Sequence, residues 1–282
     1  MPQAPLALVT GASSGIGRET ALLLARKGWR VMACARRRRR LEELAAGQDG
    51  IEAHPLDLAD AAALEEFCAR LAEADPPVEL LINNAGYSVR GVVEKVPLEA
   101  VRRMFEVNFF ALCRLTQAVL PGMRRLHRGT VVNVSSIAGK MVFPANGYYS
   151  ASKHALEAVT DALRHEVAPF GIKVIAIRPG PIATEFGQVV RQTSGPWLED
   201  PDYQPVYDKA LGFLQRVTGA QEVPGPEVVA RLILEVIDDP HPLPSYAVGP
   251  LTQDYLPRRL QGPEDKWRDF LDRELGLKEL GL

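Results

Sequence analysis

The chain of 282 residues contains few cysteines and no long uninterrupted run of apolar residues. Its three cysteines, Cys34, Cys68 and Cys113, are odd in number and lie within apolar stretches. This favours buried thiols in a reducing compartment over a disulfide framework. No segment approaches the roughly 18 consecutive apolar residues of a membrane span, and the N-terminus lacks the basic region of a signal peptide. A soluble, cytoplasmic protein is therefore expected.

Charge of one sign is not in excess either. The formal net charge of −2 gives no reason to expect nucleic acid or an anionic membrane as a partner. The five histidines show no ligand spacing such as His-x-x-x-His, so no metal site is expected. The 46% of hydrophobic residues is ample for a core, and the length favours one α/β domain, residues 1–282, over two.

Short β-branched runs alternate with longer helical patterns over the first 180 residues. This alternation predicts a parallel sheet with helices on both faces. Asp60 is the expected N-cap of one helix, Pro97 suits the first turn of the next, and Gly171 is the expected left-handed cap of a third. The expected strands are 6–10, 30–35, 52–56, 79–83, 130–135, 173–177 and 246–248, and the expected helices include 16–27, 147–170 and 226–237.

The pattern weakens after Gly180. Residues 181–225 contain Pro, Gly, Ser and aromatic residues without steady periodicity, which indicates a long, partly helical loop. Such a loop in a compact domain is more often a substrate-binding loop or lid than filler. The tail, residues 249–282, contains an amphipathic segment that we expect to pack on its own domain, with a subunit contact as the alternative; its apolar residues are Trp267, Phe270, Leu271 and Leu275.

A glycine-rich turn joins the first expected strand to the first helix. Its glycines follow the spacing Gly-x-x-x-Gly-x-Gly, and no lysine follows the last one as it would in a P-loop. Glycines also serve ordinary turns. Between a first strand and a first helix, however, they allow close approach to a pyrophosphate, which the N–H groups of the helix N-terminus favour. The turn therefore predicts a dinucleotide cofactor; it reads Thr10-Gly11-Ala12-Ser13-Ser14-Gly15-Ile16-Gly17.

The end of the second strand indicates which nicotinamide cofactor binds. An NAD site usually places a carboxylate there for the ribose 2′-hydroxyl, but this strand runs into Arg36 and Arg37. Arg36, with Arg37 beside it, is suited to charge-assisted hydrogen bonds with a 2′-phosphate. The alternative is a solvated basic helix start, which is our interpretation of residues 38–40. NADP(H) is thus predicted over NAD(H).

Tyr149 and Lys153 lie four residues apart in a predicted helix, so they share a face roughly 6 Å apart along its axis. The stripe continues through apolar positions, which is unexpected for a solvated lysine. A nearby cation stabilises a phenolate, although such a pair also arises by chance.

Two further polar features accompany the Tyr149–Lys153 pair. The strand over 130–135 ends in Ser135 and Ser136, and Asn108 lies on an apolar stripe, either at the site or as a satisfied core amide.

Together these residues resemble the short-chain dehydrogenase/reductase family, in the subgroup with the Thr-Gly-x-x-x-Gly-x-Gly turn and the Tyr-x-x-x-Lys pair. The resemblance covers about residues 5–190 and adds Asn83-Asn84-Ala85-Gly86 and Arg178-Pro179-Gly180-Pro181. It implies a Rossmann-type, doubly wound α/β fold with a seven-stranded parallel sheet, helices on both faces and the site at the carboxyl ends of the strands.

The resemblance also implies roles. Tyr149 is the general acid/base, while Lys153 bonds the nicotinamide ribose and lowers the pKa of the tyrosine. Ser136 holds the substrate oxygen, because the family separates this serine from its tyrosine by thirteen positions; Ser135 is the alternative. Asn108 holds a water that links Lys153 to solvent.

The same resemblance places the cofactor. Asp57 falls where the family bonds the adenine amine, residues 84–86 border the adenosine ribose, and residues 179–184 meet the nicotinamide, with Thr184 the candidate for its carboxamide. The expected cofactor-binding residues are Gly11, Ser13, Ser14, Gly15, Ile16, Gly17, Arg36, Arg37, Asp57, Leu58, Asn84, Ala85, Gly86, Tyr149, Lys153, Pro179, Gly180, Ile182 and Thr184.

The function expected on this basis is hydride transfer between NADP(H) and a carbonyl or alcohol carbon. The branch that the chain resembles includes carbonyl reductases and hydroxysteroid and retinol dehydrogenases, which favours a lipophilic substrate. Alternatives are a non-catalytic NADP(H)-binding sensor or scaffold, and a sugar-nucleotide epimerase, against which the glycine spacing argues. A homodimer or homotetramer is expected. Five aromatic residues are expected to line an apolar pocket or the core: Phe143, Tyr148, Phe186, Trp197 and Phe213.

Overall fold

Seven parallel strands form one sheet, in the order β3-β2-β1-β4-β5-β6-β7, in a computed structural model that describes residues 4–220 and 222–276. The strand order reverses between β1 and β4, where a doubly wound sheet opens a crevice at its carboxyl edge. The predicted fold class is confirmed. The strands are β1 (Leu6–Thr10), β2 (Arg30–Ala35), β3 (Ile51–Pro55), β4 (Val78–Asn83), β5 (Gly129–Val134), β6 (Ile172–Pro179) and β7 (Ser245–Val248).

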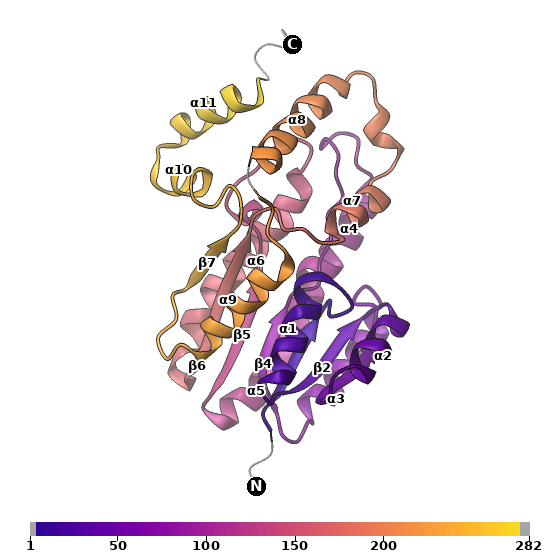
Figure 1. Cartoon of the computed structure of the whole chain (residues 1–282), viewed down its shortest axis with the longest axis vertical. Coiled ribbons are helices and arrows are strands. Elements are labelled where there is room, and N and C mark those ends of the chain that lie inside the picture. Colours follow the sequence, from indigo (N-terminus) through magenta and orange to yellow (C-terminus); the bar gives the residue numbers. More distant parts are fainter. Residues whose placement is uncertain (1–3, 221, 277–282) are drawn as a thin grey trace.

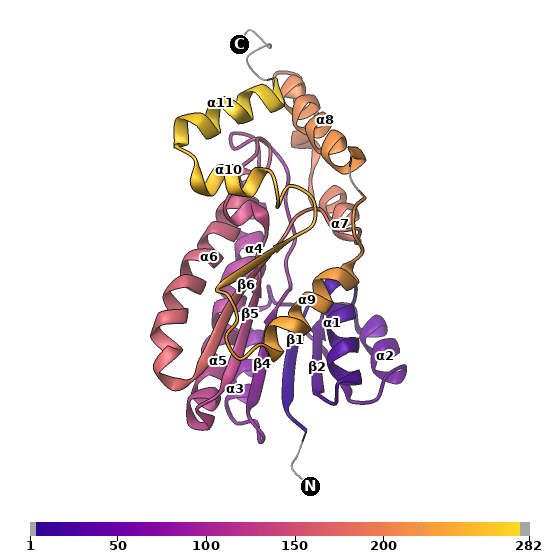
Figure 2. The same cartoon turned by 60° about the vertical axis from the view of Figure 1, so that its left-hand side comes forward.

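Helices cover both faces of the sheet, as Figure 2 shows. One layer contains α1 (Gly15–Arg26), α2 (Arg38–Ala46) and α9 (Pro226–Asp238), and the other α3 (Ala61–Ala72), α5 (Ala111–Leu126) and α6 (Gly147–Val167). Successive side chains of a strand point to opposite faces. Leu8 therefore joins the core beneath the second layer, whereas Val9 joins the core beneath the first. This two-sided burial explains the continuous apolar run of β1.

Local signals in the sequence position several element ends. Asp60 caps α3, its Oδ1 accepting the N–H groups of Ala62 and Ala63 at 3.1 Å each. Gly171 has a φ of +70°, as expected of a left-handed cap. The helix predicted over 147–170 is α-helical only to Val167, and residues 168–170 form a 3₁₀ turn containing Pro169, which has no N–H for an α-helical bond.

The helix expected after Pro97 is interrupted. It consists of α4 (Leu98–Phe105), a single π-helical turn, η1 (Glu106–Phe110), and then α5. A π turn inserts extra backbone into a helix and is frequently found at functional sites. Asn108 lies within this turn and its side chain is fully buried.

Residues 181–225 are more helical than the sequence pattern indicates. They contain α7 (Phe186–Thr193), a 3₁₀ turn, η4 (Pro196–Glu199), and α8 (Gln204–Ala220). With the tail helices α10 (Tyr255–Gln261) and α11 (Glu264–Leu275), they lie beyond the carboxyl ends of the strands (Figure 1). The part of the tail that the structure describes packs on its own chain, with Phe213 against Tyr255 at 5.7 Å between ring centroids.

Cys34 and Cys68 are buried, Cys113 is half-buried, and all three thiols are free. Burial raises the pKa of the Cys34 thiol to about 12, so it stays protonated and unreactive. Within residues 4–220 and 222–276, no helix combines the length and apolar character needed to cross a bilayer.

Candidate active site

The glycine turn and the segment after β4 are joined through Thr10. Its hydroxyl donates to the carbonyl of Ile82 and accepts the N–H groups of Asn84 and Ala85, both at 2.9 Å. The Asn84 amide also donates to the Thr10 carbonyl at 2.9 Å. Sequence reasoning missed this role of Thr10. The only signal for it was its place at the end of the first strand.

Packing explains why two positions of the turn are glycine. A Cβ at Gly11 would lie 2.7 Å from the Asn84 amide nitrogen, and one at Gly17 would lie 2.5 Å from it. Gly11 and Gly15 also have positive φ angles, +68° and +54°, which favour glycine. The turn is therefore built to hold Asn84 close, in addition to any approach to a ligand.

A cavity of about 910 Å³ opens beside the turn. Ser13, Ser14 and Gly15 line one side of it, and Thr184 lines the other. Ser14 is the N-cap of α1, and its side chain makes no capping hydrogen bond to the first N–H groups of the helix. A free helix N-terminus in a cavity suits a phosphate, and the residues present thus fit a dinucleotide.

The basic residues after β2 have different surroundings. Arg37 donates to Ser13 Oγ at 3.0 Å, to Ser14 Oγ at 2.5 Å and to Glu185 at 2.6 Å. Arg40 also contacts Glu185, at 2.8 Å, and is thus not simply solvated as the sequence suggested, whereas Arg38 pairs only with Glu42 of its own helix. Arg36 is exposed and has no side-chain hydrogen bond or ion pair within the described ranges. Arg36 is therefore the guanidinium that is free to take a ligand.

The other expected cofactor residues follow the carboxyl ends of their strands. Asp57, after β3, accepts the N–H of Ala59 at 3.0 Å and lies 3.4 Å from Arg103, next to the buried Leu58. The N–H of Gly180 donates to Val248 at 2.8 Å, which fixes the end of β6 against β7. Buried Pro179 precedes it, Ile182 packs on the core beneath α1 and α9, and Ile16 and Gly17 begin α1.

Tyr149 and Lys153 lie on the first turns of α6, and both are buried. The Lys153 ammonium donates to the carbonyl of Val134 at 2.9 Å. The Ser136 hydroxyl lies close enough to that of Tyr149 to act on its pKa, and Ser136 Oγ accepts the N–H of Ala138. The hydroxyl brought to Tyr149 is thus that of Ser136, while Ser135 faces Glu157.

Asn108 holds the segment after β4 that contains Tyr87. Its Oδ1 accepts the N–H of Tyr87 at 3.0 Å, and its Nδ2 donates to the Tyr87 carbonyl at 2.8 Å and to Ser152 Oγ at 3.1 Å. Ser152 in turn donates to the Tyr149 carbonyl at 2.7 Å. The Asn108 amide is therefore a satisfied buried group that ties the π turn to α6. Ser152, between the tyrosine and the lysine in sequence, was missed as a positioning residue.

Gly86 lies against the side chains of both Asn108 and Lys153. A Cβ there would come within 3.1 Å of Asn108 Oδ1 and 3.5 Å of the Lys153 ammonium nitrogen. Gly86 therefore packs closely against Asn108 and Lys153, and the place of residues 84–86 on the cofactor side stays a prediction.

Burial dominates the protonation of both catalytic candidates. It raises the pKa of Tyr149 to about 12, against the smaller opposing effect of the Ser136 hydroxyl. It lowers the pKa of Lys153 to about 8, against the opposing negative charge of Glu157. The expected lowering of the tyrosine pKa by Lys153 is wrong for this structure, in which burial raises the pKa and Ser136 is the group that opposes the rise. At neutral pH the phenol is therefore protonated and suited to donate a proton.

The five aromatic residues divide into two groups. Tyr148 and Trp197 pack in the cluster that contains Tyr149, and the Phe186 ring lies 5.9 Å from the Tyr149 ring. Phe143 and Phe213 instead stack on each other at 5.4 Å within the core beneath the tail. Phe186 thus contacts the tyrosine ring, Tyr148 and Trp197 pack on the cluster that contains it, and the other two are core residues.

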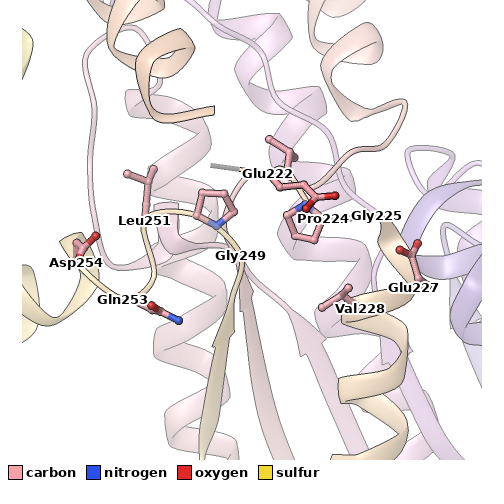
Figure 3. Close-up of a pocket in the computed structure, with 11 residues that line it drawn as sticks. Glu222, Pro224, Gly225, Glu227, Val228, Gly249, Leu251, Gln253 and Asp254 are labelled. Atoms are coloured by element: carbon pink, nitrogen blue, oxygen red, sulfur yellow. The ribbon is translucent and has the colours of Figure 1, made fainter. Parts of the chain in front are cut away.

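A second cavity, of about 470 Å³, lies between the start of α9 and the end of β7 (Figure 3). Within the part of the chain that the structure describes, its lining includes the carboxylates of Glu222, Glu227 and Asp254 and no basic residue, whereas the cavity beside the glycine turn has three arginines among its carboxylates. The acidic lining of this second cavity does not suit an anionic cofactor. Neither cavity is lined by Ser136, Tyr149 or Lys153. Among the described residues, no group of three or more His, Cys, Asp or Glu side chains lies close enough to hold a metal ion.

Comparison with known proteins places this geometry in a family. Residues 5–195 match the family model described as short chain dehydrogenase. The "Probable short-chain type dehydrogenase/reductase VdlC" of Helicobacter pylori is 41% identical over 215 residues, 73% of this chain and 79% of its own. A short-chain dehydrogenase structure from Streptomyces avermitilis superimposes with a TM-score of 0.82 at 33% identity, covering 100% of both chains.

A third similar protein is the short-chain dehydrogenase from Sphingobium yanoikuyae, solved in complex with NADPH. Its TM-score is 0.72 at 27% identity, covering 98% of this chain and 95% of that one. A family model that matches most of the chain, a curated relative and full-length structural neighbours agree. This chain therefore belongs to the short-chain dehydrogenase/reductase family of oxidoreductases.

Proposed function

We propose that this oxidoreductase transfers a hydride between NADP(H) and a carbonyl or alcohol carbon, with Tyr149 as the general acid/base. The observation that carries the proposal is the buried Tyr149 beside the half-buried Ser136, one turn from Lys153, at the carboxyl ends of β5 and β6. A protonated phenol held in place by a second hydroxyl is what carbonyl reduction requires.

The chain's own residues divide the work. Ser136 and Tyr149 hold the substrate oxygen, and Tyr149 gives it a proton as the carbonyl carbon is reduced. The nicotinamide, when bound, supplies the hydride or, in the reverse direction, accepts it. Lys153 bonds the nicotinamide ribose and stabilises the phenolate that remains. Asn108, in its π turn, holds the water that returns a proton through Lys153.

The preference for NADP(H) over NAD(H) is supported by the end of β2. Arg36 lies there without an internal partner, and no carboxylate follows the strand to bond a ribose 2′-hydroxyl. Ser13 and Ser14 lie where we propose that the cofactor phosphates bind. Arg37 is hydrogen-bonded to both serines and to Glu185. The NADPH complex of the Sphingobium yanoikuyae relative is consistent with this preference.

A lipophilic substrate is supported by the aromatic residues around Tyr149, namely Tyr148, Phe186 and Trp197. We propose that residues 181–225 form the wall of the substrate pocket and that residues 249–282 buttress it, within one domain of residues 1–282. We also propose that two copies pair through α5 and α6. Phe110 and Val159, which are 51% and 39% exposed, lie in that region.

The test is NADPH oxidation at neutral pH against a panel of aldehydes, ketones, quinones and ketosteroids, with Tyr149→Phe alongside. Tyr148→Phe is the matched control, because its hydroxyl bonds only the Val93 carbonyl. Loss of turnover in Tyr149→Phe alone is the expected result. Equal turnover in both variants would refute the assignment of Tyr149. Tight NADPH binding without any turnover would favour the non-catalytic sensor instead.

A further inference from the structure

Glu157 is a buried carboxylate that the proposed mechanism does not use. It lies one helical turn beyond Lys153 on α6, and only 2% of it is exposed. Carboxylates are almost never buried to this extent unless they are paired. Glu157 is paired with the Arg178 guanidinium through both oxygens, at 2.9 and 2.7 Å, and Lys140 lies 3.3 Å away.

The partners of Glu157 come from separate segments of the site. Arg178 belongs to β6 and directly precedes Pro179, where the nicotinamide segment begins. Lys140 follows the 3₁₀ turn that Ser136 caps, and the buried Ser135 hydroxyl, just after β5, lies beside the Glu157 side chain. The segments that carry Ser136, Tyr149 and Pro179 therefore meet at one side chain.

Close packing leaves the carboxylate no alternative position. A Cβ at Gly139 would lie 2.9 Å from Glu157 Cγ and 2.7 Å from Ser135 Oγ. The glycine lets the turn after Ser136 rest directly on the Glu157 side chain. A displacement of Glu157 would consequently be passed on to the backbone that positions Ser136.

Glu157 is also the negative charge that acts on Lys153. Burial alone favours the neutral amine, and the Glu157 charge opposes it. The charged and titratable groups around Glu157 are Arg178 from β6, Lys140 from the segment after the 3₁₀ turn η2 (Ile137–Gly139), and Lys153 and Asp161 from α6 itself. Asp161 is half-exposed and bonded to Arg164, and Tyr149 is the other titratable group beside Lys153 on α6.

We propose that Glu157 is a positioning residue, which joins the Ser136, Tyr149 and nicotinamide segments through Arg178 and Lys140 and keeps Lys153 in its charged form. The proposal rests on the proposed function, because only there does Lys153 need its charge to bond the ribose and stabilise a phenolate. Neither the family match nor the names of the relatives assign Glu157 a role.

The first test measures Lys153 directly in the cofactor-free protein. Lysine labelled with ¹³C at Cε is titrated by NMR, and the Lys153 resonance is identified by its loss in Lys153→Met. Glu157→Gln keeps the size of the side chain and removes its charge, and is expected to lower the pKa of Lys153 by at least about one unit. Glu166→Gln, an exposed change on the same helix, is the matched control and leaves the titration unchanged.

The second test follows kcat against pH for a substrate found in the panel. In Glu157→Gln the fall of kcat at alkaline pH is expected to begin at least about one unit lower, whereas Glu166→Gln follows the parent profile. If Glu157→Gln does not fold, Glu157→Gln with Arg178→Gln, which leaves no unpaired charge, is measured instead. An unchanged Lys153 titration in the folded variant would overturn the proposal. Absence of turnover in the parent chain would overturn the proposed function alone, since the NMR titration needs no substrate.

Discussion

The ammonium nitrogen of Lys153 lies 2.9 Å from the carbonyl oxygen of Val134, the last residue of β5. A side chain of α6 is thereby held to the edge of the sheet where the crevice opens. A buried lysine with a fixed backbone partner loses little further entropy when it binds a ligand.

We predict that Lys153→Met lowers turnover by at least about 100-fold and also weakens NADPH binding, whereas Tyr149→Phe lowers turnover alone. The reason is that only Lys153 bonds the ribose in the proposed mechanism. NADPH fluorescence titration and steady-state rates measure the two effects. Lys173→Met is the matched control. Lys173 donates to the Asp239 carbonyl at 2.7 Å, and this contact lies away from the site. Equal loss of turnover in both lysine variants would contradict the assignment.

The pH dependence follows from the two buried groups. Lys153, with its pKa lowered to about 8, loses its proton above that pH, while Tyr149, with its pKa raised to about 12, keeps its own. Carbonyl reduction is expected to be constant between about pH 6 and 7.5 and to fall roughly tenfold per unit above pH 8. Rates at saturating NADPH check this. A rate that rises through pH 9 would contradict it.

The lowered pKa of Lys153 also makes the stability of the fold depend on pH, and stability is expected to rise where the reduction rate falls. The folded chain holds fewer protons on Lys153 than the unfolded chain between pH 8 and the ordinary value of 10.5, so this group's contribution to stability increases as pH rises through that window. Chemical denaturation of the parent and of Lys153→Met at pH 7.5 and pH 9.5 isolates the effect. The free energy of unfolding that Lys153 adds between pH 7.5 and pH 9.5 is expected in the parent and absent in Lys153→Met.

Cofactor preference is expected to depend on Arg36. Arg36→Ala should weaken NADPH binding about 10- to 100-fold and leave NADH binding unchanged, because a charge-assisted hydrogen bond contributes about 1.5–3 kcal/mol. Arg38→Ala is the control, since Arg38 is 71% exposed and pairs only with Glu42. Arg37→Ala should weaken both cofactors, because Arg37 also holds Ser13 and Ser14. Unchanged NADPH affinity in Arg36→Ala would count against the NADP(H) assignment.

Asn108 is expected to affect folding and turnover together. Asn108→Leu leaves both backbone groups of Tyr87 without their partner and should lower the free energy of unfolding by about 2–4 kcal/mol. Asn83→Leu is the control, because Asn83 is equally buried but bonds Thr116 and Asn133 inside the core. Urea unfolding and kcat separate the effects. We expect both variants to lose stability and only Asn108→Leu to lose kcat.

The tail is expected to stabilise the segment after Ser136. Trp267 packs in a cluster with Ile137, which directly follows that serine, and with Met141 a few residues later. Trp267→Ala should cost about 3–5 kcal/mol of unfolding free energy and raise KM for the substrate, while NADPH affinity stays the same. Leu260→Ala, at a position 54% exposed, serves as the control. An unchanged KM in Trp267→Ala would separate the tail from the substrate pocket.

Local signals in the sequence were sufficient for the elements and their order. The continuous apolar run of β1, the carboxylate cap at Asp60 and the left-handed Gly171 each involve only a few neighbouring residues, so a sequence pattern can report them. The alternation of strands and helices then leaves few topologies for a parallel sheet. Lys153 and Asn108 were noticed because a polar side chain on an apolar stripe is costly without a partner. Tyr149 was noticed by its spacing of four residues from that lysine, and Ser136 was chosen by the resemblance to the family.

Only the tertiary structure decided which polar groups meet. Thr10 with Asn84, Asn108 with Tyr87, and Glu157 with Arg178 are contacts between distant parts of the chain. The π turn at Asn108 and the helices of residues 181–225 depend likewise on packing rather than on local periodicity. Burial then outweighs the local expectation for Tyr149, because desolvation depends on every element packed around the phenol and not on its sequence neighbours.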